Sequence, residues 1–440
     1  MDEYLLRRSN LAEQMCNESI AIVPGAELQS RNSDTEYPFR QNSDFYYLTA
    51  FCEPYALMAL CKDNKGVVTF ILFNQASDPA AEVWTGKRAG QGGACKIYKA
   101  NESYDIATID EVMPSLFANK QTIYYPLGVD DDFDLKILKW LKSSKSNLSR
   151  KNIANTTVAF IPNTLIDVLP LIHELRLFKS EQEIADMRRA AEISAHGHIK
   201  LMQLCKAGQM EYQLEAMFNA HCLHSGCRSL AYGSIVAGGN NGCTLHYVAN
   251  DQVLKDGDLV LVDAGGEYNY YASDITRTFP VSGKFTQEQK QIYNIVLQAQ
   301  LAGIEQIKPG NTVNQVQDAI LEVIVRGLLE LGILKGNVKQ LISSQEYKKY
   351  YMHSSGHWLG LDTHDVGRYK INNQWRKFKP GMVLTVEPGI YIANDTLNIN
   401  QKWLGIGVRI EDDVLVTKKG YEVLSHHAPK QIEEIESAML

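Results

Sequence analysis

The sequence lacks the features of a secreted or membrane-bound protein. No apolar run in its 440 residues approaches the roughly 18 residues that a membrane-spanning helix needs, and the N-terminal segment contains no apolar core of a signal peptide. The eight cysteines form no C-x-x-C pair and are far too sparse for a disulfide scaffold. We therefore expect reduced thiols in a cytoplasmic protein that does not associate with membranes.

Basic charge is also scarce. The chain has 44 Lys and Arg residues against 51 Asp and Glu residues, which gives a formal net charge of −7. General nucleic-acid binders usually carry a basic face, so this balance predicts no nucleic-acid partner. Apolar residues make up 45% of the chain, which is too high a share for a disordered protein. The length favours two or three domains with sizeable cores.

Residues 1–172 predict a mixed α/β domain. A helix is expected from Asp131 to Leu141, where the apolar residues have helical spacing, and a loop is expected over the polar segment 142–155. Four short apolar runs, several of them bounded by turn residues, predict strands. They lie at 57–60, 67–73, 122–125 and 157–161.

Residues 173–440 predict an α+β domain. Ser180 is a good N-cap for its first helix, and Glu183 completes a capping box three residues later. Three further helices are expected, one from Glu211, one at 286–308 and one at 313–331. Strands are expected at 258–262, 275–279, 382–386, 408–410 and 414–416. Helices and antiparallel strands grouped in this way are typical of the α+β class.

Two segments of this second domain resemble each other. Residues 379–389 repeat the pattern of residues 255–265, 124 positions earlier: a turn, an apolar strand, a carboxylate at the strand end and a glycine two residues later. Each copy is also preceded by a histidine and followed by a second carboxylate. In chain order these residues are His246, Asp263, Asp274, His364, Glu387 and Glu411. A duplicated half-domain with a pseudo-two-fold axis would bring the four acids together.

Four acids in one pocket require compensating positive charge. Burying even one unpaired carboxylate is expensive, and like charges a few ångströms apart do not all stay ionised. Two divalent cations supply that charge. The ligand set is rich in oxygen, with one or two histidines and no cysteine, and it suits Mn, Co, Fe(II) or Mg, and also co-catalytic Zn. The sequence therefore predicts a site for two divalent metal ions.

The histidines are concentrated in one segment rich in glycine and serine. His353, His357 and His364 lie within twelve residues, where the small neighbours suggest a backbone held close to a site. A lone histidine is more often a core or surface residue than a ligand. Here the glycine density and the nearby acids favour a functional interpretation.

The contexts of these residues resemble a known family. They are V-D-A-G at Asp263, S-D-I-T-R-T-F at Asp274, S-G-H-W-L-G-L-D at His357, V-E-P-G-I-Y at Glu387 and G-V-R-I-E-D-D at Glu411. This set looks like the metal signature of the pita-bread metallopeptidases, and its order resembles the bacterial type of the aminopeptidase P (Xaa-Pro aminopeptidase) branch. Segments 42–49 and 174–180 also look like family segments, so the resemblance covers almost the whole chain.

The resemblance implies a creatinase-like N-terminal domain over 1–172 and a pita-bread catalytic domain over 173–440. It implies two metal ions, usually Mn²⁺, with Co, Fe, Zn or Mg as alternatives. The implied metal ligands are Asp263, Asp274, His357, Glu387 and Glu411, with Asp274 and Glu411 bridging the two ions. The further catalytic residues that it implies are His246, His353, His364, Tyr391 and Arg409.

The implied reaction removes the N-terminal residue from a peptide with proline at its second position. We expect a hydroxide that bridges the two metals to attack the carbonyl before proline. Glu387 is expected to act as general base and proton shuttle, and His246 and His364 to donate hydrogen bonds to the tetrahedral intermediate. His353 and Tyr391 are expected to line the proline pocket.

Several alternatives stay open at this point. Arg409 is expected to form a structural ion pair with Asp263 or Glu411. Prolidase, which cleaves only Xaa-Pro dipeptides, shares the ligand set, and a non-catalytic peptide-binding protein of the same fold is a more distant alternative. The resemblance also implies a homo-oligomer, a dimer or tetramer, formed through the N-terminal domain. Asp44 and Trp84 are then expected to close the pocket, either in cis or from a neighbouring subunit.

Overall fold

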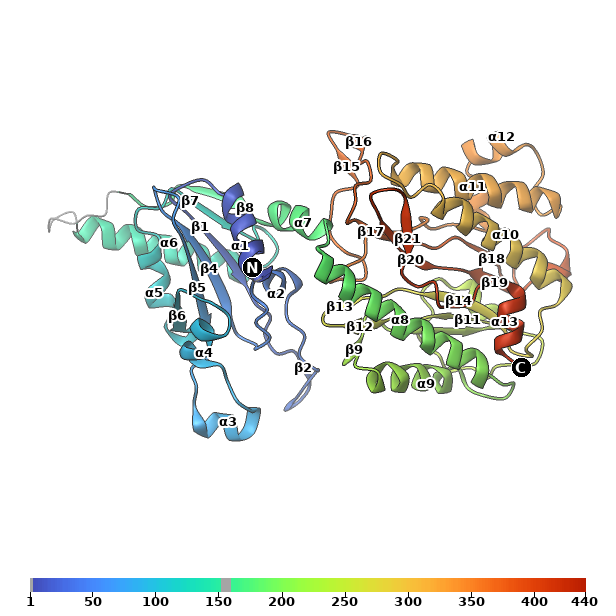
Figure 1. Cartoon of the computed structure of the whole chain (residues 1–440), viewed down its shortest axis with the longest axis horizontal. Helices are drawn as coiled ribbons and strands as arrows, with labels where there is room; N and C mark the ends of the chain where they lie inside the picture. Colours follow the sequence, from blue (N-terminus) through green and yellow to red (C-terminus); the bar gives the residue numbers. More distant parts are fainter. Residues whose placement is uncertain (1–2, 152–159) are drawn as a thin grey trace. The chain divides into compact units, whose positions relative to one another are not determined.

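The chain divides into two compact units, Met1–Arg176 and Leu177–Leu440 (Figure 1). The computed structural model describes residues 3–151 and 160–440. The division predicted from the sequence, between residues 172 and 173, lies four residues earlier than the one between the units. Each unit has its own hydrophobic core, as expected for a chain too long to fold around a single one.

The first unit is a mixed α/β domain around one six-stranded sheet. Its elements are α1 (Glu3–Gln14), β1 (Ser19–Pro24), β2 (Ser30–Asn32), β3 (Thr35–Glu36), α2 (Ser43–Thr49), β4 (Leu57–Lys62), β5 (Val68–Asn74), α3 (Pro79–Thr85), α4 (Gly90–Lys96), β6 (Glu102–Asp105), η1 (Ile106–Thr108), α5 (Ile109–Leu116), β7 (Thr122–Tyr125), α6 (Asp131–Lys151), β8 (Thr164–Asp167) and α7 (Leu169–Leu177). The strand order is β6-β5-β4-β1-β7-β8. Strands β1, β4 and β5 pair antiparallel, whereas β6, β7 and β8 run parallel to the strands they join.

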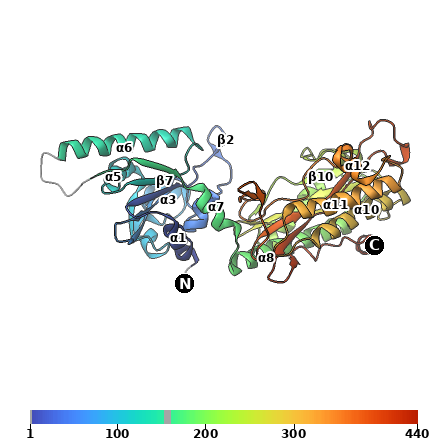
Figure 2. The same ribbon diagram turned by 90° about the horizontal axis from the view of Figure 1, so that it is seen from above.

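Helices cover both faces of this sheet (Figures 1 and 2). On one face, Met113 and Phe117 from α5 and its end, and Trp140 from α6, pack against strand residues such as Ile22 and Leu57. Helices α1 and α2 contact β4 on the other face. The prediction of an α/β domain is confirmed.

The prediction of a loop over 142–155 is wrong for 142–151, and residues 152–155 lie outside the described residues. Helix α6 continues without interruption to Lys151. The side chains at 142–147 are exposed except for Ser144, so their polarity reflects a helix face turned to water rather than a break in the helix. Ser144 marks the inner face, because its hydroxyl donates to the carbonyl of Pro114 at 2.7 Å.

The strand predicted at 157–161 is displaced. Residues 157–159 lie outside the described residues, and Phe160 and Ile161 are not in a strand. The strand that joins β7 is β8, whose side chains are only half-buried or exposed. An edge strand of this kind has no continuous apolar run, and periodicity alone therefore does not reveal it.

The second unit contains long helices and several short antiparallel sheets. Its elements are α8 (Glu181–Leu204), α9 (Glu211–His224), β9 (Ser229–Leu230), β10 (Ile235–Gly238), η2 (Gly239–Cys243), β11 (Leu259–Asp263), β12 (Gly266–Tyr268), β13 (Tyr271–Ala272), β14 (Thr276–Pro280), α10 (Gln287–Ile304), α11 (Val313–Glu330), α12 (Val338–Ser343), η3 (Glu346–Lys349), β15 (Lys370–Ile371), β16 (Gln374–Trp375), β17 (Val383–Val386), β18 (Gly389–Ile392), η4 (Gln401–Trp403), β19 (Ile406–Arg409), β20 (Asp412–Val416), β21 (Tyr421–Val423) and α13 (Ile432–Ala438). The capping box at Ser180 and Glu183 is present, and the four predicted helices are confirmed as α8 to α11. These four helices cover one face of the sheets and share one core with them (Figure 2).

The predicted repeat forms two similar strand pairs. Strand β11 pairs antiparallel with β14, and β17 pairs antiparallel with β20. In each pair the first strand leads into a carboxylate, and the second strand begins one or two residues after another carboxylate. Hydrogen bonds between the Thr278 hydroxyl and the backbone of Arg409, at 3.0 and 3.2 Å, join β14 to β19 and so connect the two halves.

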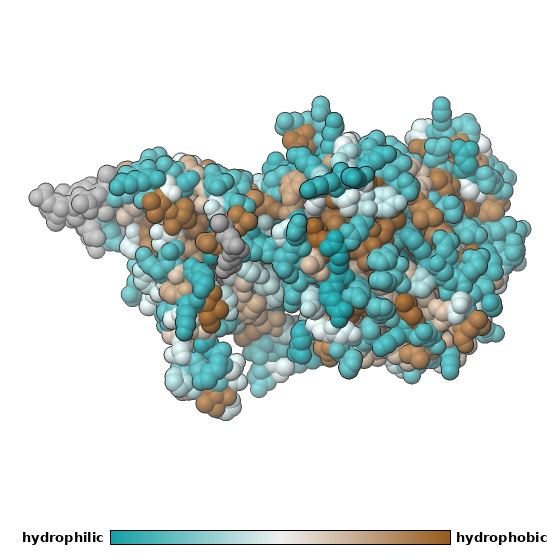
Figure 3. All heavy atoms as spheres, viewed as in Figure 1, coloured by the Kyte–Doolittle hydropathy of each residue, from teal (hydrophilic) through white to brown (hydrophobic). Residues whose placement is uncertain are grey.

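The surface seen in Figure 3 is mainly hydrophilic, with apolar side chains in small separate groups. One group lies on α3, where Val83 and Trp84 are 82% and 88% exposed. Within the described parts of the chain, no helix has both the length and the apolar composition needed to span a bilayer.

Candidate metal centre

The predicted metal ligands lie at strand ends and in the histidine-rich segment. Asp263 ends β11, Asp274 precedes β14, Glu387 follows β17 and Glu411 precedes β20. His357 is held beside β17 by two contacts to Thr385: its N–H donates to the threonine hydroxyl at 3.1 Å, and its carbonyl accepts from the threonine N–H at 2.9 Å. The pairing of the strands, and of the His357 backbone with β17, therefore fixes the backbone positions from which all five side chains extend.

The structure brings these side chains together. Asp274, His357 and Glu411 each offer one ligand atom, and the three atoms lie within 4.8 Å of one another. His357 Nε2 lies 3.4 Å from Asp274 Oδ2 and 3.7 Å from Glu387 Oε1. Residues from both copies of the repeat thus meet at one place, as the sequence predicts.

Tyr232 connects the remaining acid to this group. Its hydroxyl oxygen lies 2.6 Å from Oδ1 of Asp263 and 2.6 Å from Oδ1 of Asp274. One hydroxyl proton is therefore shared between two carboxylate oxygens. Burial, together with these acids, raises the pKa of Tyr232 well above its usual value, so the hydroxyl stays protonated.

Arg409 is the buried cation of the site. Its Nη2 lies 2.6 Å from Asp263 Oδ2, and its Nη1 donates to the Tyr391 hydroxyl at 3.1 Å. Its Nε donates to the Thr276 hydroxyl at 3.1 Å, and this hydroxyl donates to Glu411 Oε2 at 2.7 Å. The expected ion pair is confirmed, and it is made with Asp263.

Burial raises the cost of ionising the acids. Burial and two neighbouring carboxylates raise the pKa of Glu387 to about 7, and burial with three neighbouring acids raises that of Glu411 well above its usual value. Burial also disfavours the ionised form of Asp274, but the hydrogen bond and charge of His357, the Tyr232 hydroxyl and Arg409 together outweigh burial and lower the pKa of Asp274. Burial would lower the pKa of His357, but Asp274, Glu387 and the Trp358 carbonyl together raise it to about 9.

The arrangement fits divalent metal ions. Among the described residues, the charged partners of the four carboxylates are Arg409 and a protonated His357, which do not balance four negative charges. The donors are carboxylate oxygens and an imidazole nitrogen, without a thiolate, and divalent ions such as Mn²⁺ accept this set. A cation among these oxygens would favour ionised Glu387 and Glu411, which burial alone opposes.

His353 lies beside Glu387, with its Nδ1 3.6 Å from Glu387 Oε2. Nδ1 is also 2.8 Å from the Ser354 carbonyl oxygen, and Nε2 is 2.8 Å from the Tyr391 hydroxyl. The carbonyl accepts only, so the proton is assigned to Nδ1, and the Tyr391 hydroxyl donates to Nε2. Burial and Arg409 lower the pKa of His353 to about 4, which keeps the ring neutral.

His364 and His246 are exposed near the ligands. The His364 ring meets the His357 ring edge to face, with centroids 4.3 Å apart. Burial and His357 lower the pKa of His364, and His246 is close enough to contribute to this shift and to that of His353. Both side chains are open to solvent and therefore to a substrate.

Gly265 lets two backbone segments approach next to the acids. A Cβ at this position would collide with the carbonyl oxygen of Ser273, the residue before Asp274. Because Gly265 follows Asp263 by two residues, this close approach sets the spacing of the two acids.

Known proteins match the whole chain. Residues 185–418 match the model of metallopeptidase family M24, and residues 4–124 match the aminopeptidase P N-terminal domain. The chain belongs to metallopeptidase family M24. Xaa-Pro aminopeptidases of Escherichia coli and Haemophilus influenzae are each 42% identical to this M24 peptidase over 438 and 442 residues, which is 100% of this chain and 97% of each relative. The solved structure of aminopeptidase PepP from Pseudomonas aeruginosa has a TM-score of 0.96 at 47% identity, covering 99% of this chain and 97% of that one.

These matches confirm the fold that the motifs imply: an aminopeptidase P N-terminal domain followed by an M24 catalytic domain. The family implies divalent metal ions for this M24 peptidase, in agreement with the cluster of Asp274, His357 and Glu411. Sequence reasoning missed Tyr232. No acid, histidine or repeat stands beside it in the segment 230–233, so nothing in a single sequence marks it.

Proposed function

We propose that this M24 peptidase is an Xaa-Pro aminopeptidase, which removes the N-terminal residue from peptides with proline at the second position. The observation that carries the proposal is the convergence of Asp274, His357 and Glu411 in a chain that matches Xaa-Pro aminopeptidases over nearly their whole length. The same relatives favour this activity over that of a prolidase. The retained acid and histidine cluster argues against a binding protein without catalysis.

Two divalent ions are the proposed cofactors, with Mn²⁺ placed before Co, Fe, Zn and Mg. Asp263 would hold one ion, His357 and Glu387 the other, and Asp274 and Glu411 would bridge them. Oxygen donors in this number, with one imidazole, support the choice of Mn²⁺. When bound, such ions lower the pKa of a water molecule and polarise a carbonyl oxygen.

Glu387 is the proposed proton acceptor and proton shuttle. Its two carboxylate oxygens face different partners, one 3.7 Å from His357 and the other 3.6 Å from His353. Its side chain is 17% exposed, more than those of Asp263 and Asp274, at 12% and 7%. A proton taken at this edge can be delivered to the proline nitrogen, which has no N–H in the peptide and needs one to leave.

The remaining residues are proposed to bind and orient the substrate. His246 and His364 would donate hydrogen bonds to the oxygen of the attacked carbonyl group. His353 and Tyr391 would line the proline pocket, with Arg409 holding the Tyr391 hydroxyl that orients His353. Arg409 acts here as a positioning residue.

We also propose that the protein forms a homo-oligomer through its first unit. Its proposed location is the cytoplasm. The exposed Val83 and Trp84 on α3 support an interface, and the eight free cysteines support a reducing compartment. Asp44 is buried and bonds to Arg176 at 2.7 Å, so Trp84 is the better candidate to reach a neighbouring subunit.

A substrate-length series with defined Mn²⁺ loading tests the activity. We expect cleavage of Xaa-Pro-Xaa and Xaa-Pro-Xaa-Xaa peptides and none of the matched Xaa-Ala-Xaa-Xaa control. Hydrolysis of Xaa-Pro dipeptides alone would identify a prolidase instead. Binding of these peptides without hydrolysis by the metal-loaded protein would favour the non-catalytic alternative.

A further inference from the structure

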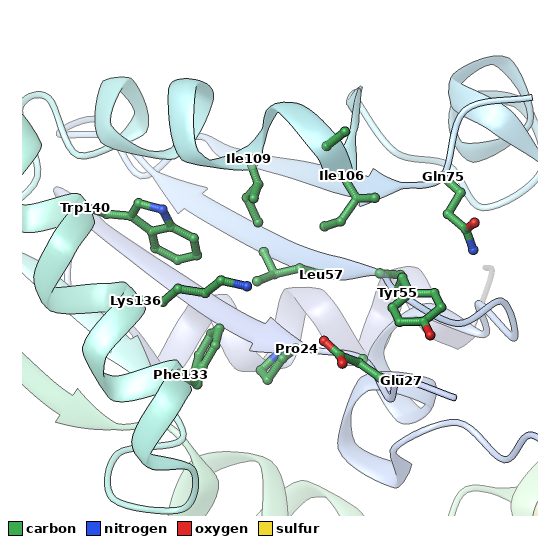
Figure 4. Close-up of a pocket in the computed structure, with 13 residues that line it drawn as sticks. Pro24, Glu27, Tyr55, Leu57, Gln75, Ile106, Ile109, Phe133, Lys136 and Trp140 are labelled. Carbon is green, nitrogen blue, oxygen red and sulfur yellow. The ribbon is translucent and has the colours of Figure 1, made fainter. Parts of the chain in front are cut away.

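The first unit contains a pocket of about 330 Å³, and every residue that lines it belongs to that unit. The pocket lies between strands β1 and β4 on one side and η1, α5 and α6 on the other (Figure 4). Its apolar walls come from Pro24, Leu57, Ile106, Ile109, Phe133 and Trp140. None of the residues proposed for catalysis or metal binding contributes to it.

The apolar end of the pocket is preformed. Leu57, Ile109 and Trp140 are only 3%, 8% and 2% exposed, so the surrounding core holds their side chains in place. The indole N–H of Trp140 donates to Asp110 Oδ1 at 2.7 Å, which fixes the ring and leaves its apolar surface to the pocket. At about 30 Å³ for each water-sized group, the volume corresponds to roughly eleven non-hydrogen atoms. This places it at the small end of ligand-binding cavities.

Two opposite charges, those of Lys136 and Glu27, lie at the mouth of this apolar space, and both residues are exposed to solvent. Figure 4 shows the Lys136 ammonium reaching in from α6 and the Glu27 carboxylate reaching in from the segment after β1. Within the described residues, neither group has an ion-pair or hydrogen-bond partner. Tyr55 and Gln75 lie at the end of the pocket where Glu27 lies. The amide N–H of Gln75 donates to the Pro54 carbonyl at 3.1 Å, and its amide oxygen remains as a hydrogen-bond acceptor.

We propose that this pocket binds a free α-amino acid with a large apolar side chain. The ligand carboxylate pairs with Lys136, its ammonium pairs with Glu27, and its side chain packs against Leu57 and Trp140. A ligand with only a carboxylate would leave Glu27 unpaired and facing a like charge, and a ligand with only an ammonium would do the same at Lys136. A zwitterion satisfies both, and leucine or phenylalanine matches the pocket in size.

Isothermal titration calorimetry of the full, metal-loaded protein with L-phenylalanine tests the proposal. We expect binding that Lys136→Gln weakens by about two- to fivefold, because an ion pair with a solvent-exposed ammonium is lost. Lys139→Gln is the matched control, since Lys139 is exposed on the same helix and does not line the pocket. The Lys136→Gln variant should cleave the peptides of the substrate series at the unchanged rate, which separates this site from the catalytic one.

Two further comparisons identify the ligand class and the location. N-acetyl-phenylalanine and phenylalanine amide each lack one charge, and each should bind about two- to fivefold more weakly than phenylalanine. Ala107 lines the pocket and is exposed, so Ala107→Phe should fill the space and abolish binding without disturbing the core. The proposal is overturned if phenylalanine does not bind, if Lys136→Gln and Lys139→Gln bind it equally, if Ala107→Phe still binds it, or if N-acetyl-phenylalanine binds equally well.

Discussion

Removal of divalent metal is expected to destabilise the second unit, and this effect follows from the charges at its centre. Four carboxylates converge there, three of them buried and that of Glu387 half-buried, and Arg409 and His357 are their charged partners among the described residues. Without metal, the remaining negative charge either stays ionised in a buried place or takes up protons. Both outcomes cost free energy that the unfolded chain, with its acids in water, does not bear.

The size of the effect follows from mass action. An ion that binds only the folded state stabilises it by about 2.7 kcal/mol at a free concentration one hundred times its Kd. The unit runs from Leu177 to Leu440, and domains of roughly this length shift in Tm by about 2–4 °C for each kcal/mol. Each bound Mn²⁺ at this concentration should therefore raise the Tm of the metal-free protein by about 5–11 °C.

Differential scanning calorimetry on one preparation measures this change. The protein is stripped with a chelator, its metal content is determined by mass spectrometry, and Mn²⁺ is then added back in steps. We expect the Tm to rise with Mn²⁺ concentration and to level off. A Tm that is the same before and after verified metal removal would refute the charge argument.

Glu411→Gln is a control that should change the stability of the metal-free protein in the opposite direction. Glu411 is 2% exposed, and the amide oxygen of glutamine can still accept the hydrogen bond from Thr276. The substitution removes one of the repelling charges, so the metal-free variant should be at least as stable as the metal-free wild type. It should also lose most of the gain from Mn²⁺, because a ligand is missing. A clearly less stable metal-free variant would show that repulsion does not dominate at this position.

Three further predictions concern single residues. Glu387→Gln should lower kcat by at least about 10²-fold while circular dichroism shows an intact fold, and a near-normal kcat would remove Glu387 as the proton acceptor. Gly265→Ala should cost about 1–3 kcal/mol in urea unfolding and weaken Mn²⁺ binding, because its Cβ must displace the Ser273 carbonyl; unchanged Mn²⁺ affinity would contradict this link. Arg277→Met should cost about 3–5 kcal/mol in urea unfolding, since Arg277 and Asp412 form a fully buried pair at 2.6 Å; a loss below about 1 kcal/mol would show that Lys430, 2.7 Å from Asp412, is a sufficient partner for that carboxylate.

Much of the catalytic unit follows from local patterns. The capping box at Ser180 and Glu183 marks the start of α8, because a cap uses only residues three apart. The offset repeat predicts that Asp263 and Glu387 occupy equivalent places, because a carboxylate at the end of a buried strand has a position determined by that strand. In the first unit the same reasoning fails for 142–151 and for β8. An exposed helix face and an edge strand carry no apolar signal of their own.

The residue types by themselves therefore predict the chemistry of the site. The acids, the histidines and their spacing are enough to predict that divalent metal ions bind there. Contacts between distant segments do not follow from the sequence alone. That Tyr232 lies between Asp263 and Asp274, that Arg409 pairs with Asp263 rather than Glu411, and that a charged pocket opens beside Trp140 all depend on packing. These partners are decided by the tertiary structure, because a buried polar group has no water to bond with and must pair with the neighbours that the fold places beside it.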